Sequence, residues 1–433
     1  MVVVRKLGLI SALAAAAALL VPSGSAAVGS GSFTPTGSMS ITRYGPSAAL
    51  LNDGRVLVVG GHDGSAFSKT AEIFNPATGT FSPTGSMVEA RLGPGLVTLA
   101  DGRVLVAGGG ISPAPPLASA EIYDPATGTF TETGVGAMGT ARANPAAARL
   151  PDGRVLIAGG FTGGPTSTNT AEVFNPVTKT FSSTGIGSMA HARANAPAVP
   201  LADGRILIAG GFEYPDNLDS SEIFNPATNT FSSSGIGPLT LIRGAPAGAP
   251  LPGGRALIAG GFVGPMPSTS AEAFNPATNT YSSTGIGSLN TPRYVAAAAP
   301  LADGRVLVAG GYDGTHNLAS AEIYSATNTF SFSLRGRELI VAVSASGTVE
   351  VSGSAGGKAA TAKKKKRLLK TSSTKGDPPV IEVRLRLSKE ARRRFKRGGA
   401  VKVRARITFH PDGGLVNTKT AKLKIKKGGK KGK

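Results

Sequence analysis

A sixfold internal repeat constrains the fold of this chain more than any other feature. The run Arg55–Gly61, with the sequence RVLVVGG, returns in similar form five more times, beginning at Arg103, Arg154, Arg205, Arg255 and Arg305. The Gly-Gly pairs in these runs are 48, 51, 51, 50 and 50 residues apart. A period near 50 indicates a propeller or solenoid, in which each unit buries its faces against its neighbours.

Each repeat is expected to contain four short strands. In the first repeat these are Gly45–Leu51, Arg55–Val59, Ala71–Phe74 and Thr80–Ser82. Asp53-Gly54 predicts a tight turn, because both residues tolerate positive φ. The second strand is apolar on both faces, as a strand covered by neighbouring sheets should be. Pro76 ends the third strand, since proline has no N–H to donate to a ladder.

The repeat resembles the kelch repeat over about residues 32–333. The resemblance is carried by the Gly-Gly pair, the strand Ala71–Phe74 with its Glu and aromatic residue, the turn Asn75–Thr80, and a later Met/Leu…Arg segment. Similarity to the galactose oxidase-like and kelch propeller superfamily implies a β-propeller. Where kelch repeats usually have Trp, this chain has Phe81, Phe130, Phe181, Phe231, Tyr281 and Phe330.

The number of blades depends on one N-terminal segment. Phe33–Met39 copies the fourth-strand segment Phe81–Met87, yet it precedes every first strand. We therefore expect it to supply the outer strand of the last blade, which gives an all-β fold with a six-bladed kelch-type propeller over residues 28–333. The alternative is a seventh, degenerate blade that recruits Glu338–Ser352.

The first 27 residues have the features of a secretory signal peptide. Arg5 and Lys6 precede the apolar run Leu7–Val21, and small residues follow up to Ala27. The prediction is a secreted or envelope-associated protein, with cleavage after Ala26 or Ala27. The alternative, a retained membrane anchor, requires about 20 apolar residues. The chain has no Cys, so no disulfide stabilises it outside the cell.

Charge separates the C-terminal part from the rest. Residues 334–433 carry 29 Lys and Arg against 6 Asp and Glu, a net of +23, and the remainder has a net of −2. Alternating apolar and polar residues predict strands at Val380–Leu387, Val401–Phe409 and Thr418–Ile425, and a hairpin over Glu338–Ser352. Ser388–Arg397 predicts a short helix with a Ser cap. The pattern resembles small bacterial immunoglobulin-like modules and indicates a small β-sandwich-like domain over residues 334–433, with a flexible stretch at Gly353–Lys366.

The basic part is expected to bind a polyanion, such as an anionic envelope polymer, an acidic polysaccharide, lipid headgroups or extracellular nucleic acid. The candidate contacts are Lys363, Lys364, Lys365, Lys366, Arg367, Arg392, Arg393, Arg394, Lys396 and Arg397. Nucleic acid is the least favoured, because Phe395 alone does not make a stacking platform. The alternative is that these lysines and arginines only keep the strands soluble.

The sequence indicates no catalytic residue, cofactor or metal. A copper-radical site similar to that of galactose oxidase needs a Cys-modified Tyr, and this chain has no Cys and four scattered His (His62, His191, His316 and His410). The loops between second and third strands vary most between repeats. One carries Glu213, Asp216 and Asp219, which could hold a hard cation but also fit a polar turn.

Six arginines at one repeat position, just before each first strand, are the candidate ligand-binding residues: Arg43, Arg91, Arg142, Arg193, Arg243 and Arg293. In kelch propellers this position lies at the rim of the axial channel. A ring of guanidinium groups there could bind carboxylates or phosphates bidentately. The alternative is that each Arg pairs with a repeated Glu or with backbone carbonyls and connects the blades.

Three functions remain in view. The favoured one is an exported, non-catalytic binding protein whose propeller recognises protein or carbohydrate and whose basic tail attaches to anionic envelope or extracellular polymers. The second is a secreted enzyme with a divergent active site in the propeller channel. The third is a passive surface-layer protein, which would assemble with itself and bind no soluble ligand.

Overall fold

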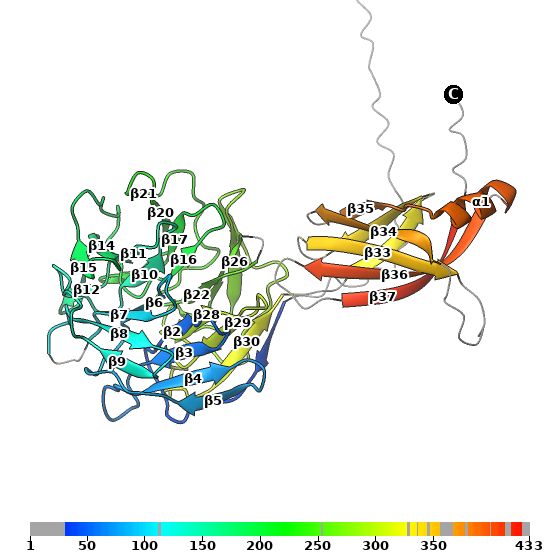
Figure 1. The fold of residues 1–433 in the computed structure, drawn as a ribbon. Coiled ribbons are helices and arrows are strands. Elements are labelled where there is room, and N and C mark those ends of the chain that lie inside the picture. Colours follow the sequence, from blue (N-terminus) through cyan, green and yellow to red (C-terminus); the bar gives the residue numbers. More distant parts are fainter. Residues whose placement is uncertain are drawn as a thin grey trace, which may run out of the picture.

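The computed structural model describes residues 31–110, 114–252, 254–326, 330–335, 337–343, 347–355, 367–376, 380–398, 400–411 and 417–426. The predicted signal peptide, residues 1–27, lies outside these ranges. The regular secondary structure of the described chain is almost entirely β, arranged as many small antiparallel sheets (Figure 1). Within these ranges, no helix has the length and hydropathy needed to cross a membrane.

Six four-stranded antiparallel sheets account for the six repeats. Their first strands are β2 (Ser47–Leu50), β6 (Gly95–Thr98), β10 (Ala146–Arg149), β16 (Ala198–Pro200), β22 (Ala247–Pro250) and β28 (Ala297–Pro300). The second strands are β3 (Val56–Val59), β7 (Val104–Ala107), β11 (Val155–Ala158), β17 (Ile206–Ala209), β23 (Ala256–Ala259) and β29 (Val306–Ala309). Every residue of these second strands is buried, because neighbouring sheets cover both faces.

The third strands pair with the second and carry the repeated Glu. They are β4 (Ala71–Asn75), β8 (Ala120–Asp124), β14 (Ala171–Asn175), β20 (Ser221–Asn225), β26 (Ala271–Asn275) and β30 (Ala321–Ser325). The fourth strands of the first five sheets are β5 (Thr80–Pro83), β9 (Thr129–Thr131), β15 (Thr180–Ser182), β21 (Thr230–Ser232) and β27 (Thr280–Ser282). These bounds agree with the strands expected from the first repeat.

The sixth sheet takes its outer strand from the N-terminal end of the described chain. β1 (Ser32–Pro35) pairs antiparallel with β30, with Phe33 opposite Tyr324. The first strands contact one another in chain order, and β28 contacts β2. The six sheets therefore form a closed ring, and the expectation that Phe33–Met39 provides the last outer strand is confirmed at Ser32–Pro35.

Three loops between second and third strands form two-stranded ribbons. These are β12 (Phe161–Gly163) with β13 (Thr166–Ser167), β18 (Phe212–Glu213) with β19 (Asp216–Asn217), and β24 (Phe262–Val263) with β25 (Met266–Pro267). Each ribbon begins directly after a Gly-Gly pair. The residue that follows the glycines, Phe161, Phe212 or Phe262, is therefore the first residue of each ribbon.

The C-terminal part consists of two sheets around one core. One sheet has the order β31 (Phe330–Arg335), β32 (Glu338–Val343), β35 (Val380–Arg384). The other has the order β34 (Arg367–Gly376), β33 (Gly347–Ala355), β36 (Ala400–Pro411), β37 (Asn417–Lys426). Leu339 and Val341 of the first sheet belong to the same buried cluster as Val403 and Ile407 of the second.

The helix α1 (Lys389–Gly398) packs its Ala391 into this core. Its N-terminus is capped as expected, since Ala391 N–H donates to Ser388 Oγ at 3.2 Å. Of the flexible stretch predicted at Gly353–Lys366, residues 353–355 belong to β33, and 356–366 lie outside the described residues.

Three expectations for the C-terminal part are wrong. Glu338–Ser352 is not a hairpin, because β32 and β33 lie in different sheets, and for the same reason it does not form a seventh blade. The boundary at residue 334 is too late, since β31 pairs with β32 and begins at Phe330. In the other five sheets the fourth strand pairs with the third, but here β1 already pairs with the third strand, β30. The segment β31 therefore pairs with β32 instead.

Candidate functional site

The six repeated arginines lie inside the ring rather than on an exposed rim. Their exposed fractions are 0–1 %, and each forms an ion pair with the Glu of its own repeat at N–O distances between 2.6 and 3.3 Å. The partners are Glu72, Glu121, Glu172, Glu222, Glu272 and Glu322, which are also buried. A buried charge is stable only when it is paired and hydrogen-bonded.

Each guanidinium also holds the Gly-Gly pair of its own repeat. In the third repeat, Arg142 Nη1 donates to the carbonyl of Gly159 at 2.9 Å and to that of Thr170 at 2.9 Å. The second glycine of the same pair, Gly160, donates its N–H to the carbonyl of Arg193 in the next repeat at 2.7 Å. The arginine and the glycines therefore link neighbouring sheets.

The close approach explains why the first residue of the pair is glycine. Gly159 has φ +68°, and a Cβ on it would lie 2.2 Å from the Arg193 carbonyl oxygen. A side chain would meet backbone there, which cannot move aside. The same contact recurs at Gly60, where a Cβ would lie 2.2 Å from the Arg91 oxygen.

The prediction that Arg43, Arg91, Arg142, Arg193, Arg243 and Arg293 bind a ligand is therefore wrong. Most of their donors are bonded to glutamates, carbonyls and hydroxyls of the protein, and no face is open to solvent. Burial lowers the pKa of Arg43, Arg142, Arg193 and Arg293, and the paired Glu opposes that change. The alternative interpretation, a structural pairing with Glu and backbone, describes these contacts.

Acid is expected to weaken the sixth of these pairs. Burial would raise the pKa of Glu322, but N–H donors from Asn290 and Thr291 and the Arg293 charge hold it below its ordinary 4.5. A carboxyl group with a depressed pKa stabilises the fold above its unfolded pKa, and this stabilisation is lost as the pH falls through the folded pKa. The melting temperature of wild type should exceed that of Glu322→Gln most at pH 7, and the difference should shrink below pH 4.5. A difference that stays constant from pH 7 to pH 3 would contradict this pairing.

Next to the arginines, two other repeat positions form an open site. The residue after each Arg forms a β-bridge with the residue after the Gly-Gly pair. The bridged pairs are Tyr44 with His62, Leu92 with Gly110, Ala143 with Phe161, Ala194 with Phe212, Gly244 with Phe262, and Tyr294 with Tyr312. Each buried arginine therefore fixes the backbone of the residue beside it, and of these residues Tyr44, Leu92 and Tyr294 are partly exposed.

Nine of these twelve residues, all except His62, Ala194 and Tyr312, line a cavity of about 840 Å³, which we call the aromatic bowl. Its lining includes Tyr44, Phe161, Phe212, Phe262 and Tyr294, all partly exposed. The Phe262 and Tyr294 ring centroids lie 3.9 Å apart, and those of Phe161 and Phe212 lie 6.1 Å apart. No Asp, Glu, Lys, Arg or His is among the described residues that line it.

Burial raises the pKa of Tyr44 and of Tyr294. Both phenols are therefore neutral at physiological pH. Three asparagines, Asn144, Asn195 and Asn217, add amide groups to the lining. The bowl offers aromatic surface and neutral hydrogen-bonding groups, a combination that fits a ligand with little charge.

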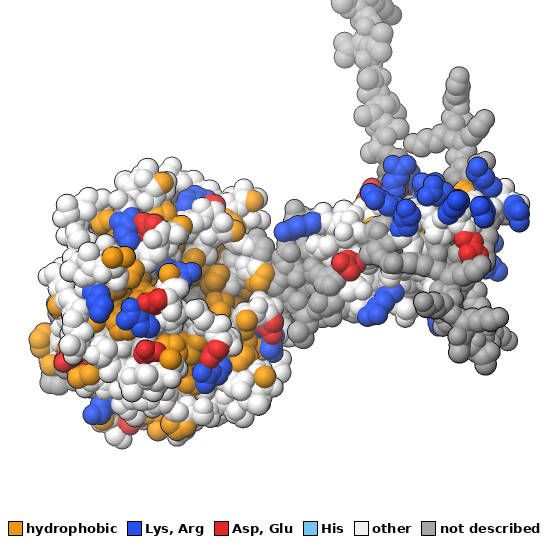
Figure 2. Space-filling view, viewed as in Figure 1, with side chains coloured by type: hydrophobic (Ala, Val, Ile, Leu, Met, Phe, Trp, Pro, Cys, Tyr) orange, Lys and Arg blue, Asp and Glu red, His pale blue; other side chains and the backbone are white. Residues whose placement is uncertain are grey.

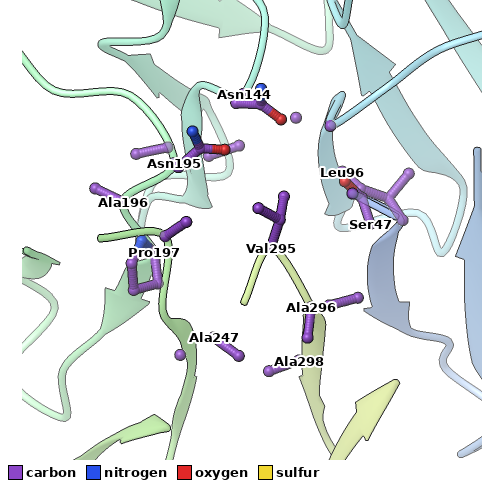
Figure 3. Close-up of a pocket in the computed structure, with 18 of the residues that line it drawn as sticks. Ser47, Leu96, Asn144, Asn195, Ala196, Pro197, Ala247, Val295, Ala296 and Ala298 are labelled. Carbon is purple, nitrogen blue, oxygen red and sulfur yellow. The ribbon is translucent and has the colours of Figure 1, made fainter. Parts of the chain in front are cut away.

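The floor of the bowl is a backbone ring around the mouth of the axial channel. The ring residues all have φ between +50° and +65°, and they are Gly45, Gly93, Asn144, Asn195, Ala245 and Val295. Neighbours are joined by N–H···O=C bonds, for example Gly93 to Gly45 at 2.9 Å and Asn144 to Gly93 at 3.0 Å. Figure 3 shows Asn144, Asn195 and Val295 around this mouth, with small residues such as Ala247 and Ala298 below.

The channel itself holds a cavity of about 170 Å³ lined mainly by Ala, Pro and Gly. Its one hydroxyl-bearing lining residue among those described is Ser47, whose Oγ donates to the Pro94 carbonyl at 2.6 Å. A nucleophile needs a neighbouring base to activate it. This lining offers Ser47 none.

The structure separates the predicted polyanion contacts. Arg392, Arg393, Lys396 and Arg397 are exposed on α1. Lys363, Lys364, Lys365 and Lys366 lie outside the described residues, and of Arg367 and Arg394 only the backbone is described, in β34 and α1.

The candidate cation loop is the ribbon β18–β19. His191 Nδ1 lies 3.1 Å from Glu213 Oε2, whereas Asp216 and Asp219 do not join them. In the part of the chain that the structure describes, no group of three or more His, Cys, Asp or Glu is placed to hold a metal ion.

Comparison with known families agrees with this geometry. Residues 43–88, 93–133 and 142–184 each match the Kelch motif. This part of the chain therefore contains kelch repeats. Kelch repeats are general protein-interaction modules and usually mediate binding. No curated protein matches the chain.

The bowl was missed in the sequence although a signal for it was present. The strands and arginines hardly change between kelch repeats, whereas the residue after each Arg reads Tyr, Leu, Ala, Ala, Gly, Tyr. The residue after each Gly-Gly pair reads His, Gly, Phe, Phe, Phe, Tyr. Variation at fixed backbone positions is typical of a binding surface on a rigid scaffold.

Proposed function

We propose that this kelch-repeat protein is an exported, non-catalytic binding protein, in which the ring is a six-bladed propeller and the aromatic bowl holds a segment of another protein. The observation that carries the proposal is the bowl itself, with its partly exposed aromatic residues on a rigid, hydrogen-bonded floor. Aromatic side chains in a preformed pocket are the common anchors of protein interfaces.

The absence of a catalytic role is part of the proposal. General acid–base chemistry needs titratable groups within hydrogen-bond reach of the substrate. The described lining of the bowl and of the channel contains none apart from the tyrosines, and burial raises the pKa of Tyr44 and Tyr294. A divergent enzyme in the channel, the second function considered, has no support in these residues.

A neutral carbohydrate is the second candidate ligand. The observation that favours it is the placement of Asn144, Asn195 and Asn217 among the aromatic rings. Amide groups can donate to and accept from sugar hydroxyls, while rings cover the apolar faces of the sugar.

The C-terminal part from Phe330 onward, which we call the basic module, is proposed to attach the protein to an anionic polymer of the envelope or its surroundings. Figure 2 shows Lys and Arg side chains gathered on this module, while acidic and basic groups are interspersed on the ring. The net charge of +23 over residues 334–433 supports an anionic partner. The proposal of export rests on the N-terminal sequence. We also propose that the basic module is immunoglobulin-like.

Substitution of two bowl aromatics tests the ligand site. Peptides and neutral glycans would first be selected on the full chain from a random peptide library and a glycan array. The double variant Phe262→Ala/Tyr294→Ala should bind the selected ligands at least tenfold more weakly, since buried aromatic anchors contribute about 2 kcal/mol or more. Tyrosine fluorescence can follow binding, because the chain has seven Tyr and no Trp.

The matched control is Phe231→Ala, which removes an aromatic ring from the outer strand β21, away from the bowl. This variant should bind as wild type does. Selected peptides support a protein ligand and selected glycans a carbohydrate ligand. Concentration-dependent assembly without any selected ligand would contradict the binding function and favour the passive surface-layer role.

A further inference from the structure

The outer face of the basic module carries a regular array of cations, which we call the cationic ladder. It consists of alternate residues on the neighbouring strands β36 and β37. These are Lys402, Arg404 and Arg406 on β36, and Lys422, Lys424 and Lys426 on β37. All six are exposed, and the residues between them face the core.

The strand register places like charges directly opposite one another. Lys402 is paired with Lys424, and Arg404 with Lys422. Directly opposed side chains have Cβ atoms about 5 Å apart, and alternate residues on a strand are about 7 Å apart. Like charges in this relation repel and destabilise the pair. None of the six forms an ion pair with another residue that the structure describes.

Protection of a sheet edge does not account for this arrangement. Lysines on an edge strand prevent pairing with other chains, and β37 is an edge strand. β36, however, lies inside the sheet between β33 and β37, and it contributes half of the ladder. A surface that serves only solubility usually mixes charges of both signs. Here the described residues of β33 that lie opposite the ladder cations, Ser352 and Ser354, are uncharged.

The cations on α1 have structural explanations that the ladder lacks. Lys396 and Arg397 lie in the last turn, where positive charge stabilises the helix dipole. Arg392 Nε donates to the Leu387 carbonyl at 3.2 Å and so connects the helix to the preceding segment. The helix is therefore the weaker candidate for the polyanion site, although the sequence singled it out.

We propose that the cationic ladder binds a linear phosphate polymer lengthwise along β36 and β37. The inference rests on the proposed attachment of the basic module to an anionic polymer. Closely spaced anions would neutralise the opposed cations, and lysine ammonium groups bind phosphate as point charges. Among the side chains that the structure describes on this face of β36 and β37, there is no Phe, Tyr or Trp, so these residues give bases and sugar rings no surface on which to stack.

Binding of long-chain inorganic polyphosphate to the full chain tests the ladder. Phosphate contacts release counterions, so log K falls with log salt by about 0.7 per contact for a flexible strand. Six contacts predict a slope of about −4. The variant Lys402→Gln/Arg404→Gln/Arg406→Gln should raise Kd at least tenfold near 0.1 M salt and reduce the slope by about 2.

The matched comparison is Arg392→Gln/Arg393→Gln/Arg397→Gln, which removes the same charge from α1. It should change Kd less than threefold. Equal losses of affinity in both variants would show that binding depends on the total charge of the module and not on the ladder. If the full chain does not bind polyphosphate but binds an acidic polysaccharide, single-stranded DNA or anionic vesicles, the ladder does not bind a phosphate polymer. The proposed attachment to an anionic polymer would then still stand. Failure to bind any of these polyanions overturns both.

Thermal stability gives a readout that does not depend on the binding assay. In low salt, polyphosphate should raise the melting temperature of the wild-type basic module, because it relieves the repulsion between opposed cations. The ladder variant should melt no lower than wild type in low salt and should gain less stability from polyphosphate than wild type does. A ladder variant that melts lower than wild type in low salt would show that these cations stabilise the sheet, and the inference would fail.

Discussion

Replacing Arg142 by alanine is expected to lower the free energy of unfolding of the ring by about 3–5 kcal/mol, the cost of removing one partner of a buried ion pair. The change leaves the Glu172 carboxylate buried without its countercharge. It also leaves the carbonyls of Gly159 and Thr170 without the donor Nη1. Chemical denaturation of the full chain, followed by circular dichroism, measures the loss.

The comparison for this variant is Arg154→Ala, which breaks an exposed ion pair in the same repeat. Arg154 Nε lies 2.7 Å from Asp152 Oδ2, with both side chains partly exposed. Exposed pairs contribute about 0–1 kcal/mol, so this variant should be nearly as stable as wild type. If Arg142→Ala kept wild-type stability and lost only ligand binding, the structural role of the six arginines would be wrong.

The strands of the ring could be predicted because each repeat contains its own evidence. The second strands are continuous apolar runs that end at Gly-Gly, and in five of the six repeats they follow an Asp-Gly turn. Pro76 and its counterparts end the third strands of the first five repeats. A pattern that would be a weak indication of a strand or turn in one repeat becomes a strong one because it recurs along the chain. The closing strand β1 was also predictable. Phe33–Met39 resembles the fourth strand of a repeat, but the first three strands of a repeat do not precede it.

The basic module was predicted less well, because its strands do not all alternate. β34 has the sequence RLLKTSSTKG, in which the apolar pair is adjacent and the rest is polar. Its pairing with β33 is also irregular, with register shifts between Val351 and Ser354. In the sequence, β32 and β33 look like the two strands of a hairpin. Each strand has an apolar face, however, and the two faces pack against each other in one core because the strands belong to two different sheets.

The position of the arginines illustrates what repeat spacing cannot show. Spacing placed all six at one structural position, but it could not decide between an open rim and a buried pair. The decision depends on the Gly-Gly pair, whose missing side chains let the guanidinium and the next repeat's backbone approach together. The proposed ligand surface lies one residue further along the chain, at positions that differ between the repeats.

Phe33→Ala is expected to destabilise the ring by about 3–5 kcal/mol, as is usual for truncation of a buried Phe. Phe33 is 6 % exposed, and its ring centroid lies 5.0 Å from that of Tyr324. It is the buried residue of β1, which is the strand that joins the two ends of the ring. Its loss should therefore weaken closure as well as local packing, and hydrogen exchange at β30 amides should accelerate.

Phe81→Ala separates these two effects. Phe81 lies on β5, which occupies the same outer position within the first repeat, and its ring centroid is 4.8 Å from that of Phe74. Its truncation removes similar packing without opening the ring, so exchange should accelerate at β4 and not at β30. Phe330 stands at the same repeat position as Phe81, and β31 is the strand that would compete with β1 for β30. If Phe330→Ala, rather than Phe33→Ala, exposed the β30 amides, the ring would be closed by β31, and β1 would not be its outer strand.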